Sequence, residues 1–310
     1  MDFILVLNQV LVLFILLMLG FILKKINIIT DELGKGLSTV IIYVTLPALI
    51  ITSMNYKFSR DILNNSIRLI IIGIIVYIFM IVVGIIFVKL LNIQEPQKGI
   101  YLFLTIFPNV GFMGYPVVEV AFGKIGVFYA AIYNLIFNVL IWTLGVILVN
   151  PEHKKKINLK SLINPGTVSI VLGFILFIFS IKLPKPIYIS LHKLGASTTP
   201  MAMLVVGSLL GDAKFKEIFG NIKLFIVALL RLIIIPLSVL FVLIRLNLSP
   251  IVAGIPVIIS SMPAAANAAI FARRFDSDYR LASQGVFLTT LISILTIPFI
   301  LFILNMIKLH

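Results

Sequence analysis

Two proline-centred segments, residues 107–111 and 261–267, carry polar groups suited to binding a small ligand. Proline lacks a backbone N–H and its ring clashes with the carbonyl four residues earlier, so a helix through either segment should break. Half-helices that begin after such breaks would point N–H groups and their positive dipole ends at a carboxylate or a similar anion. The candidate binding residues in these segments are Pro108, Asn109, Gly111, Ser261, Pro263 and Asn267.

Polar side chains also interrupt two other apolar runs. Arg231 lies eight residues beyond Lys223, roughly 12 Å along a helix, and a charge at that depth is costly. We interpret it either as an electrostatic partner for an anionic solute or as a structural residue, whose side chain contacts carbonyl groups or snorkels to the interface. Asn134 and Asn138 share one helix face, with Tyr133 beside them, and we predict that they line the same site.

Other polar groups are predicted to have structural roles. Thr289, Ser293 and Thr296 follow one helix face, where small hydroxyls commonly tie membrane helices together. Glu119 lies five residues before Lys124. We therefore place it near the outer membrane interface rather than in a proton relay.

Several kinds of chemistry are not expected. The chain has no cysteine and its three histidines occur separately, so neither a metal site nor a cofactor is predicted. The sequence contains no nucleotide-binding loop, zinc-protease motif or serine nucleophile elbow, so we do not predict an enzyme. The net charge of +14 comes from residues dispersed between apolar runs, which does not indicate nucleic-acid binding.

The elements that position these residues are long apolar runs. The chain is 61% apolar and only 12% charged, with a mean hydropathy of +1.20, unlike a soluble domain. A helix needs roughly 20 residues to cross a bilayer, so we predict an all-α integral membrane protein with ten transmembrane helices. The predicted spans are residues 3–23, 37–54, 63–91, 99–122, 126–149, 166–181, 187–210, 218–244, 251–271 and 281–307.

The longest polar connector, residues 150–160, leaves five predicted spans on either side. An odd number of spans makes the two halves, residues 1–150 and 151–310, insert in opposite orientations, as in carriers built from inverted repeats. Alternate connectors carry fifteen Lys and Arg residues on one face and nine on the other. Because the richer face is normally cytoplasmic, we predict that both termini lie outside a cell membrane.

The prolines support this division into repeats. The second and fourth spans of the first half carry Pro47 and Pro108, which are 61 residues apart, and those of the second half carry Pro200 and Pro263, 63 apart. Unwound backbone survives in a bilayer only where protein or a water-filled cavity satisfies it. A matched pair of broken helices therefore indicates a binding site.

Several ordered motifs carry a resemblance to a known family. They are Asn-Val-Gly-Phe-Met-Gly-Tyr-Pro at 109–116 with Ala-Phe-Gly at 121–123, Asn-Pro at 164–165, and the segments 200–207, 262–267, 278–286, 289–293 and 296–298. The sequence resembles, over essentially its whole length, the auxin efflux carrier family. That family joins plant PIN-type carriers to prokaryotic carriers often labelled malonate transporters.

The resemblance implies two inverted five-helix repeats with crossed, broken fourth and ninth helices. It also implies a scaffold from helices one, two, six and seven, a mobile transport unit from helices three to five and eight to ten, elevator transport, and a homodimer formed through the scaffold. It suggests binding residues at Asn109, at Tyr133 and Asn134, around Pro263 and at the scaffold position Thr52; Thr290 completes our candidates. The connector 150–160 is short where many plant carriers have a long cytoplasmic loop.

The leading hypothesis is secondary transport of a small organic anion, a malonate-like or auxin-like carboxylate, with the lipid bilayer as the other partner. One alternative is a sodium- or proton-coupled symporter of the bile acid symporter type, although no carboxylate is found at the predicted midplane. A non-transporting membrane sensor is less favoured, because 310 residues leave no room for a signalling domain.

Overall fold

A computed structural model of the chain describes residues 3–95, 97–150, 163–211, 220–246, 248–275 and 277–307. Within these residues every regular element is a helix and no strand is present, which confirms the all-helical prediction. By length and composition, five helices of the described part could cross a membrane: Asp31–Ser53, Arg60–Leu90, Val110–Val149, Ile222–Leu246 and Tyr279–Met306. The number of crossings and the inverted repeat remain predictions.

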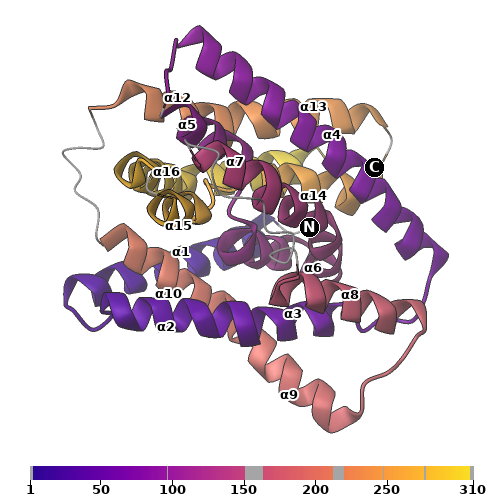
Figure 1. Cartoon of the computed structure of the whole chain (residues 1–310). Coiled ribbons are helices and arrows are strands. Elements are labelled where there is room, and N and C mark those ends of the chain that lie inside the picture. Colours follow the sequence, from indigo (N-terminus) through magenta and orange to yellow (C-terminus); the bar gives the residue numbers. More distant parts are fainter. Residues whose placement is uncertain are drawn as a thin grey trace. The chain divides into compact units, whose positions relative to one another are not determined.

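Many of the apolar runs are built from consecutive helical pieces (Figure 1). The first part of the chain contains α1 (Phe3–Lys25), α2 (Asp31–Val40), η1 (Ile41–Thr45), α3 (Leu46–Ser53), α4 (Arg60–Leu90), α5 (Gln97–Ile106), η2 (Val110–Gly114), α6 (Tyr115–Leu140), η3 (Ile141–Gly145) and α7 (Val146–Val149). The second part contains α8 (Pro165–Ile178), α9 (Lys185–Ala196), α10 (Thr198–Gly211), α12 (Ile222–Leu229), η5 (Leu230–Ile234), α13 (Ile235–Leu243), η6 (Ile244–Leu246), α14 (Pro250–Ser260), α15 (Asn267–Arg274) and α16 (Tyr279–Met306).

Three of the widened π-helical turns have a common cause in the sequence. The turns η1, η2 and η5 each end two residues before a proline, namely Pro47, Pro116 and Pro236. The proline ring has no N–H to bond the carbonyl four residues back and collides with it, so the preceding turn opens to the wider π geometry. Proline placement therefore sets where these helices widen.

Gly123 separates the predicted fourth and fifth spans within α6. Its φ of 63° and ψ of −156° are not helical, and a positive φ of this kind is accessible to glycine because it has no Cβ. The α6 range Tyr115–Leu140 therefore consists of two helices that meet at residue 123. This turn agrees with the predicted span ends at 122 and 126.

The chain divides into two compact units. Unit 1 comprises Met1–Ile70, Gly111–Leu135 and Ile163–Asp212, and unit 2 comprises Ile71–Val110, Ile136–Leu162 and Ala213–His310. The helices α4 and α6 contribute residues to both units. The predicted boundary between residues 150 and 151 adjoins residues outside the described part of the chain and stays a prediction.

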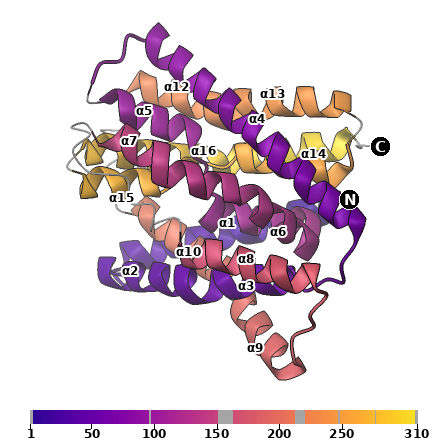
Figure 2. The same cartoon turned by 45° about the vertical axis from the view of Figure 1, so that its right-hand side comes forward.

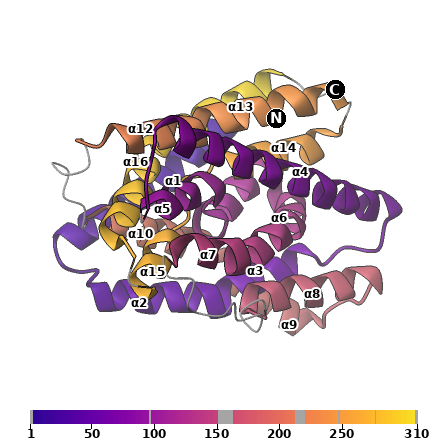
Figure 3. The same ribbon diagram turned by 45° about the horizontal axis from the view of Figure 1, so that its top comes forward.

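In unit 1, α1 packs along α10, and α3 contacts both α8 and α9 (Figures 1 and 3). The first contact is close because glycines lie on both helices. A Cβ on Gly20 would overlap the backbone of Leu204, and one on Gly207 would overlap that of Leu17. Small residues at such positions let membrane helices approach backbone to backbone.

In unit 2, α16 contacts α5, α12, α14 and α15, and α13 packs against α14 (Figure 2). The contact between α5 and α7 is again set by a glycine, because a Cβ on Gly99 would overlap the carbonyl of Leu148. Aromatic rings fill the space beside this contact, with Phe103 and Phe107 4.6 Å apart between ring centroids and Phe107 and Phe137 5.9 Å apart. This packing surrounds the end of α5, where the helix breaks.

Candidate binding site

The two broken helices meet through their backbones in unit 2. The helix α5 ends at Ile106 and α14 ends at Ser260, so both predicted interruptions are confirmed. The N–H of Asn109 donates to the carbonyl of Pro263 at 2.8 Å, and the N–H of Ala265 donates to that of Phe107 at 2.9 Å. These reciprocal bonds join the breaks in an antiparallel bridge.

Proline suits the centre of this bridge for a geometric reason. Pro108 lies opposite Ala264 in the antiparallel pair, and the bonds of the bridge come from the flanking residues. In such a non-hydrogen-bonded pair the N–H groups of the two central residues are not used. Pro108 therefore breaks α5 without removing a donor that the bridge needs.

The N–H of Ala264 is satisfied by a side chain from α16. It donates to Oγ1 of Thr289 at 3.1 Å, and this hydroxyl in turn donates to the carbonyl of Gly285 at 2.8 Å. The predicted structural role of Thr289 agrees with this contact, since the hydroxyl links α16 to the break. Thr290, which we predicted to bind substrate, is buried and donates to the carbonyl of Val286 within its own helix.

Arg231 lies where α5 and α14, the first halves of the two broken helices, come to an end. It is 0% exposed, and its Nε donates to the carbonyl of Met262 at 3.1 Å while Nη1 donates to the carbonyl of Thr105. The usual helical donor to Thr105 would be the N–H of Asn109, which instead bonds Pro263. The guanidinium therefore replaces a helical donor lost at the break.

The position of Arg231 is also electrostatically favourable. Helix C-termini carry partial negative charge from unsatisfied carbonyls, and a planar guanidinium can donate to several acceptors at once. Arg231 lies on the π-helical turn η5, and Sδ of Met80 is 3.8 Å from its Nη1. Of the two roles considered for this residue, the structural contact to carbonyls is present.

Three more of the predicted binding residues belong to unit 2, at or near the ends of its helices. Ser261 is buried and donates to the carbonyl of Ile258 in the last turn of α14. Asn267 is half-buried and is the first residue of α15, so this half-helix begins four residues after Pro263 rather than directly after it. Asn138 is half-buried near the end of α6.

Four candidates belong to unit 1. Nδ2 of Asn134 donates to the hydroxyl of Tyr115 at 3.1 Å, and Tyr133 beside it is 1% exposed. Thr52 is buried and donates to the carbonyl of Ala48 at 2.8 Å. Gly111 has open space where a Cβ would stand. Asn134 and Asn138, predicted to share a face, thus fall in different units.

Sequence reasoning missed the backbone acceptors of this site. Nothing in the residue types of Thr105 and Met262 marks their carbonyls as partners of Arg231, because any residue offers the same carbonyl. The sequence signal that could have found them is the proline itself. Pro108 leaves carbonyls of α5 without helical donors, and a buried arginine elsewhere in the chain is the kind of group that satisfies them.

Two further features bear on chemistry. Glu119 accepts a hydrogen bond from Oγ1 of Thr199 at 3.1 Å within unit 1. Across the described ranges, no group of three or more His, Cys, Asp or Glu residues could hold a metal ion.

Comparison with known proteins identifies the family. The chain matches the family described as membrane transport protein over residues 5–301. The chain belongs to this family. The predicted resemblance to the auxin efflux carriers and the prediction of a membrane transporter are thereby confirmed.

Relatives of the membrane transport protein family match along nearly their whole length. An uncharacterized transporter of Methanocaldococcus jannaschii is 25% identical over 300 residues, which cover 94% of this chain and 96% of the relative. One from Methanothermobacter thermautotrophicus is 28% identical, with 94% and 96% covered. The uncharacterized transporter YfdV of Escherichia coli is 22% identical, with 95% and 96% covered.

Proposed function

We propose that this transporter is a secondary carrier of a small organic anion, such as a malonate-like or auxin-like carboxylate, bound beside the crossing of α5 and α14. The observation that carries the proposal is the reciprocal pairing of the two broken helices, Asn109 to Pro263 and Ala265 to Phe107. Interrupted helices at the centre of a carrier present backbone groups that a solute can bind. The Asn109 side chain is proposed as a direct ligand.

Charge favours an anion over a cation. Arg231 brings a buried positive charge to the break, and the described residues that contact the break backbone include no Asp or Glu. Because Arg231 already donates to two carbonyls, we propose that it holds the two helix ends in place. Its positive charge would attract the anion without direct contact. Asn138, which belongs to the same unit as the break, is proposed to complete the site.

We also propose the elevator mechanism, with ten spans as two inverted repeats and both termini outside the plasma membrane. Its support is the family and the composition of unit 1, which contains the candidate scaffold helices α1, α2, α3, α8, α9 and α10. A transport unit from the remaining spans would carry the anion. Accessibility of single cysteines at Lys35→Cys and Lys182→Cys to an impermeant reagent in whole cells tests the orientation, since labelling only at 182 is expected.

Flux measurements test the transport proposal. Purified protein in proteoliposomes is assayed for uptake of labelled malonate, related carboxylates and indole acetate, comparing wild type with Asn109→Ala and with Asn8→Ala, an exposed position on α1. A hydrogen bond to a charged group contributes about 1.5–3 kcal/mol, so the affinity should fall roughly 10- to 100-fold in Asn109→Ala only. Equal flux of all three proteins would contradict the site.

Coupling to protons or sodium is the second candidate, and one observation favours it for protons. Glu119, predicted from the sequence to lie near the outer interface, is a half-buried carboxyl that accepts a hydrogen bond from Thr199 within unit 1. A partly buried carboxyl can take up and release a proton, a role that the sequence alone does not favour for this residue. Uptake that follows an imposed proton gradient in wild type, but not in Glu119→Gln, would support coupling at this residue.

A homodimer through the scaffold is proposed as well. Its support is a row of exposed apolar side chains on α1, with Ile15 66% and Ile22 48% exposed. The natural chain has no cysteine, so a single Ile15→Cys variant reports directly on self-association in membranes. Disulfide-linked dimers are expected for this variant, and their absence, together with a monomeric mass in detergent, would overturn the proposal.

A further inference from the structure

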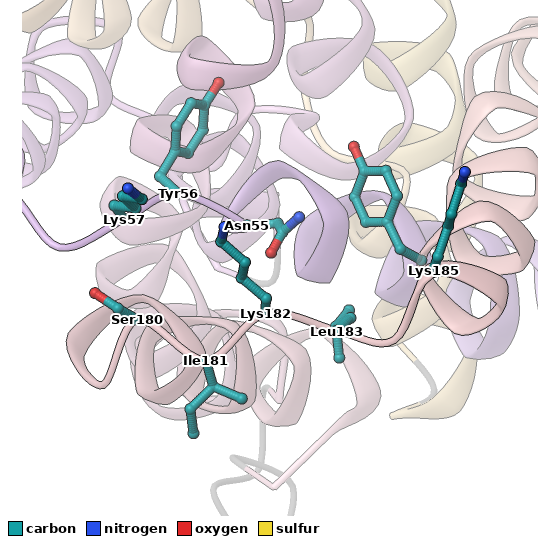
Figure 4. A pocket seen from close by; sticks show the side chains of 9 residues that line it. Asn55, Tyr56, Lys57, Ser180, Ile181, Lys182, Leu183 and Lys185 are labelled. Atoms are coloured by element: carbon teal, nitrogen blue, oxygen red, sulfur yellow. The ribbon is translucent and has the colours of Figure 1, made fainter.

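A polar pocket lies in unit 1 and shares no lining residue with the helix breaks. It has a volume of about 280 Å³ and is formed by the connectors that follow α3 and α8 together with the start of α9. Three lysines, Lys57, Lys182 and Lys185, line it together with Tyr56 and Tyr188. Figure 4 shows Lys57 and Lys185 on opposite sides, with Lys182 between them.

A backbone-to-side-chain hydrogen bond and an aromatic contact hold the walls of this lysine pocket together. The N–H of Phe58 donates to Oγ of Ser180 at 2.9 Å, which joins the two connectors, and the rings of Phe58 and Phe177 lie 5.6 Å apart. Ser180 has a φ of 50°, a left-handed conformation that ends α8. The turn therefore brings Lys182 back towards the first connector.

The positive charge of the pocket is not neutralised by protein. No Asp or Glu lines it, and in the described ranges none of Lys57, Lys182 and Lys185 forms an ion pair. A fourth ammonium adjoins, because Nζ of Lys124 donates to the hydroxyl of Tyr188 at 3.3 Å. This lysine, unlike the three that line the pocket, has the carboxyl of Glu119 as a charged neighbour. Burial raises the pKa of Tyr56, so its hydroxyl remains a neutral hydrogen-bond donor. The pocket thus offers several donors and no negative group.

Exposed apolar side chains flank the lysines. Phe179 is 70% exposed, Ile187 51% and Ile181 48%, and each lies within three residues of a pocket lysine. In a membrane protein such side chains face acyl chains, while lysines and tyrosines at helix ends lie at the level of the headgroups. A small soluble anion would bind through the lysine charges alone, whereas a phospholipid would use both the lysine charges and the exposed apolar side chains.

We propose that this lysine pocket binds the phosphate of an anionic phospholipid, with the acyl chains along the neighbouring apolar side chains. The site is distinct from the helix breaks and does not depend on the identity of the transported anion. Lysines near a membrane surface each contribute about 1 kcal/mol of attraction to anionic lipid, equivalent to about fivefold in affinity. Three of them predict a difference of about 100-fold.

Lipid titration of the whole purified protein tests the proposal. Binding of phosphatidylglycerol and of phosphatidylcholine is measured by native mass spectrometry for wild type and for the triple variant Lys57→Gln, Lys182→Gln, Lys185→Gln. The matched control replaces three exposed lysines of other helices, Lys35 of α2, Lys89 of α4 and Lys98 of α5, by glutamine. The expected result is loss of phosphatidylglycerol binding by about 100-fold in the pocket variant alone.

Further titrations distinguish binding of a lipid from binding of a free anion. Inorganic phosphate and malonate are titrated into the same proteins, and weak binding unaffected by the pocket variant is expected. A triple arginine variant should retain the lipid, and unchanged melting temperatures would show that all variants are folded. Equal lipid affinity in both glutamine triples, or malonate binding as tight as that of phosphatidylglycerol and lost with the pocket lysines, would overturn the proposal.

Discussion

Replacing Arg231 by methionine separates a residue that fixes the break from one that binds the anion directly. Arg231→Met keeps an unbranched apolar stem but removes the guanidinium that donates to Thr105 and Met262. Each hydrogen bond to a charged group contributes about 1.5–3 kcal/mol, so the two together contribute about 3–6 kcal/mol. Because methionine also avoids desolvating a buried guanidinium, we expect a net loss of about 2–4 kcal/mol.

The assay is thermal unfolding of the detergent-purified protein, followed by ligand binding at a temperature where the variant stays folded. A loss of 1 kcal/mol shifts the melting temperature by about 2–4 °C in domains of 150–250 residues, so a fall of about 5–15 °C is expected. Arg245→Met is the matched control, since Arg245 is exposed and contacts only the ring of Phe241, 4.8 Å away, among the contacts described. The control should change the melting temperature by less than about 2 °C.

The two roles predict different outcomes for the same variant. If Arg231 fixes the break, Arg231→Lys should also be destabilised, because one ammonium cannot reproduce the fork that reaches two carbonyls. A melting temperature equal to wild type in Arg231→Met, combined with complete loss of anion binding, would refute the reasoning. It would identify Arg231 as a direct ligand instead.

Three further predictions concern other contacts. Thr289→Val should lower the free energy of unfolding by about 1–3 kcal/mol, because it leaves a buried N–H of the break without its acceptor. The control Thr290→Val should change it by much less. Equal melting temperatures of the two variants would contradict the role of the Thr289 hydroxyl. Glu119→Gln keeps an acceptor for its threonine partner, so its melting temperature should match wild type, and a large drop would show that the charge itself is needed. Gly207→Leu should abolish accumulation of folded protein in membranes, because any Cβ at this position meets backbone atoms. Gly36→Leu should be tolerated, because a Cβ there has open space. Normal yields of both variants would refute the close packing of α1 and α10.

The helix interruptions could be predicted because their cause is local. The missing N–H and the ring of Pro108 act within one turn, and the positive φ of Gly123 needs only the absence of a Cβ. The same reasoning applied to Pro47, Pro116 and Pro236 could also have predicted the widened turns before them. Local covalent chemistry thus accounts for these element boundaries.

The partners across the break could not be predicted in this way. The bond from Asn109 to Pro263 joins residues far apart in the sequence, and Arg231 could have satisfied any buried carbonyl. The start of α15 at Asn267 depends on how residues 264–266 are held by the bridge and by Thr289. These features depend on tertiary contacts, so residue type alone left two readings of Arg231 open.

The backbone pairing at the crossing has an evolutionary consequence. Because the two bonds between Asn109 and Pro263 and between Ala265 and Phe107 use only main-chain groups, they place little restriction on the side chains at these positions. The restriction is that neither position 109 nor 265 can become proline, which would lack the donor. Relatives at 22–28% identity could therefore keep the same frame while the side chains around it diverge, so that one architecture serves different cargoes.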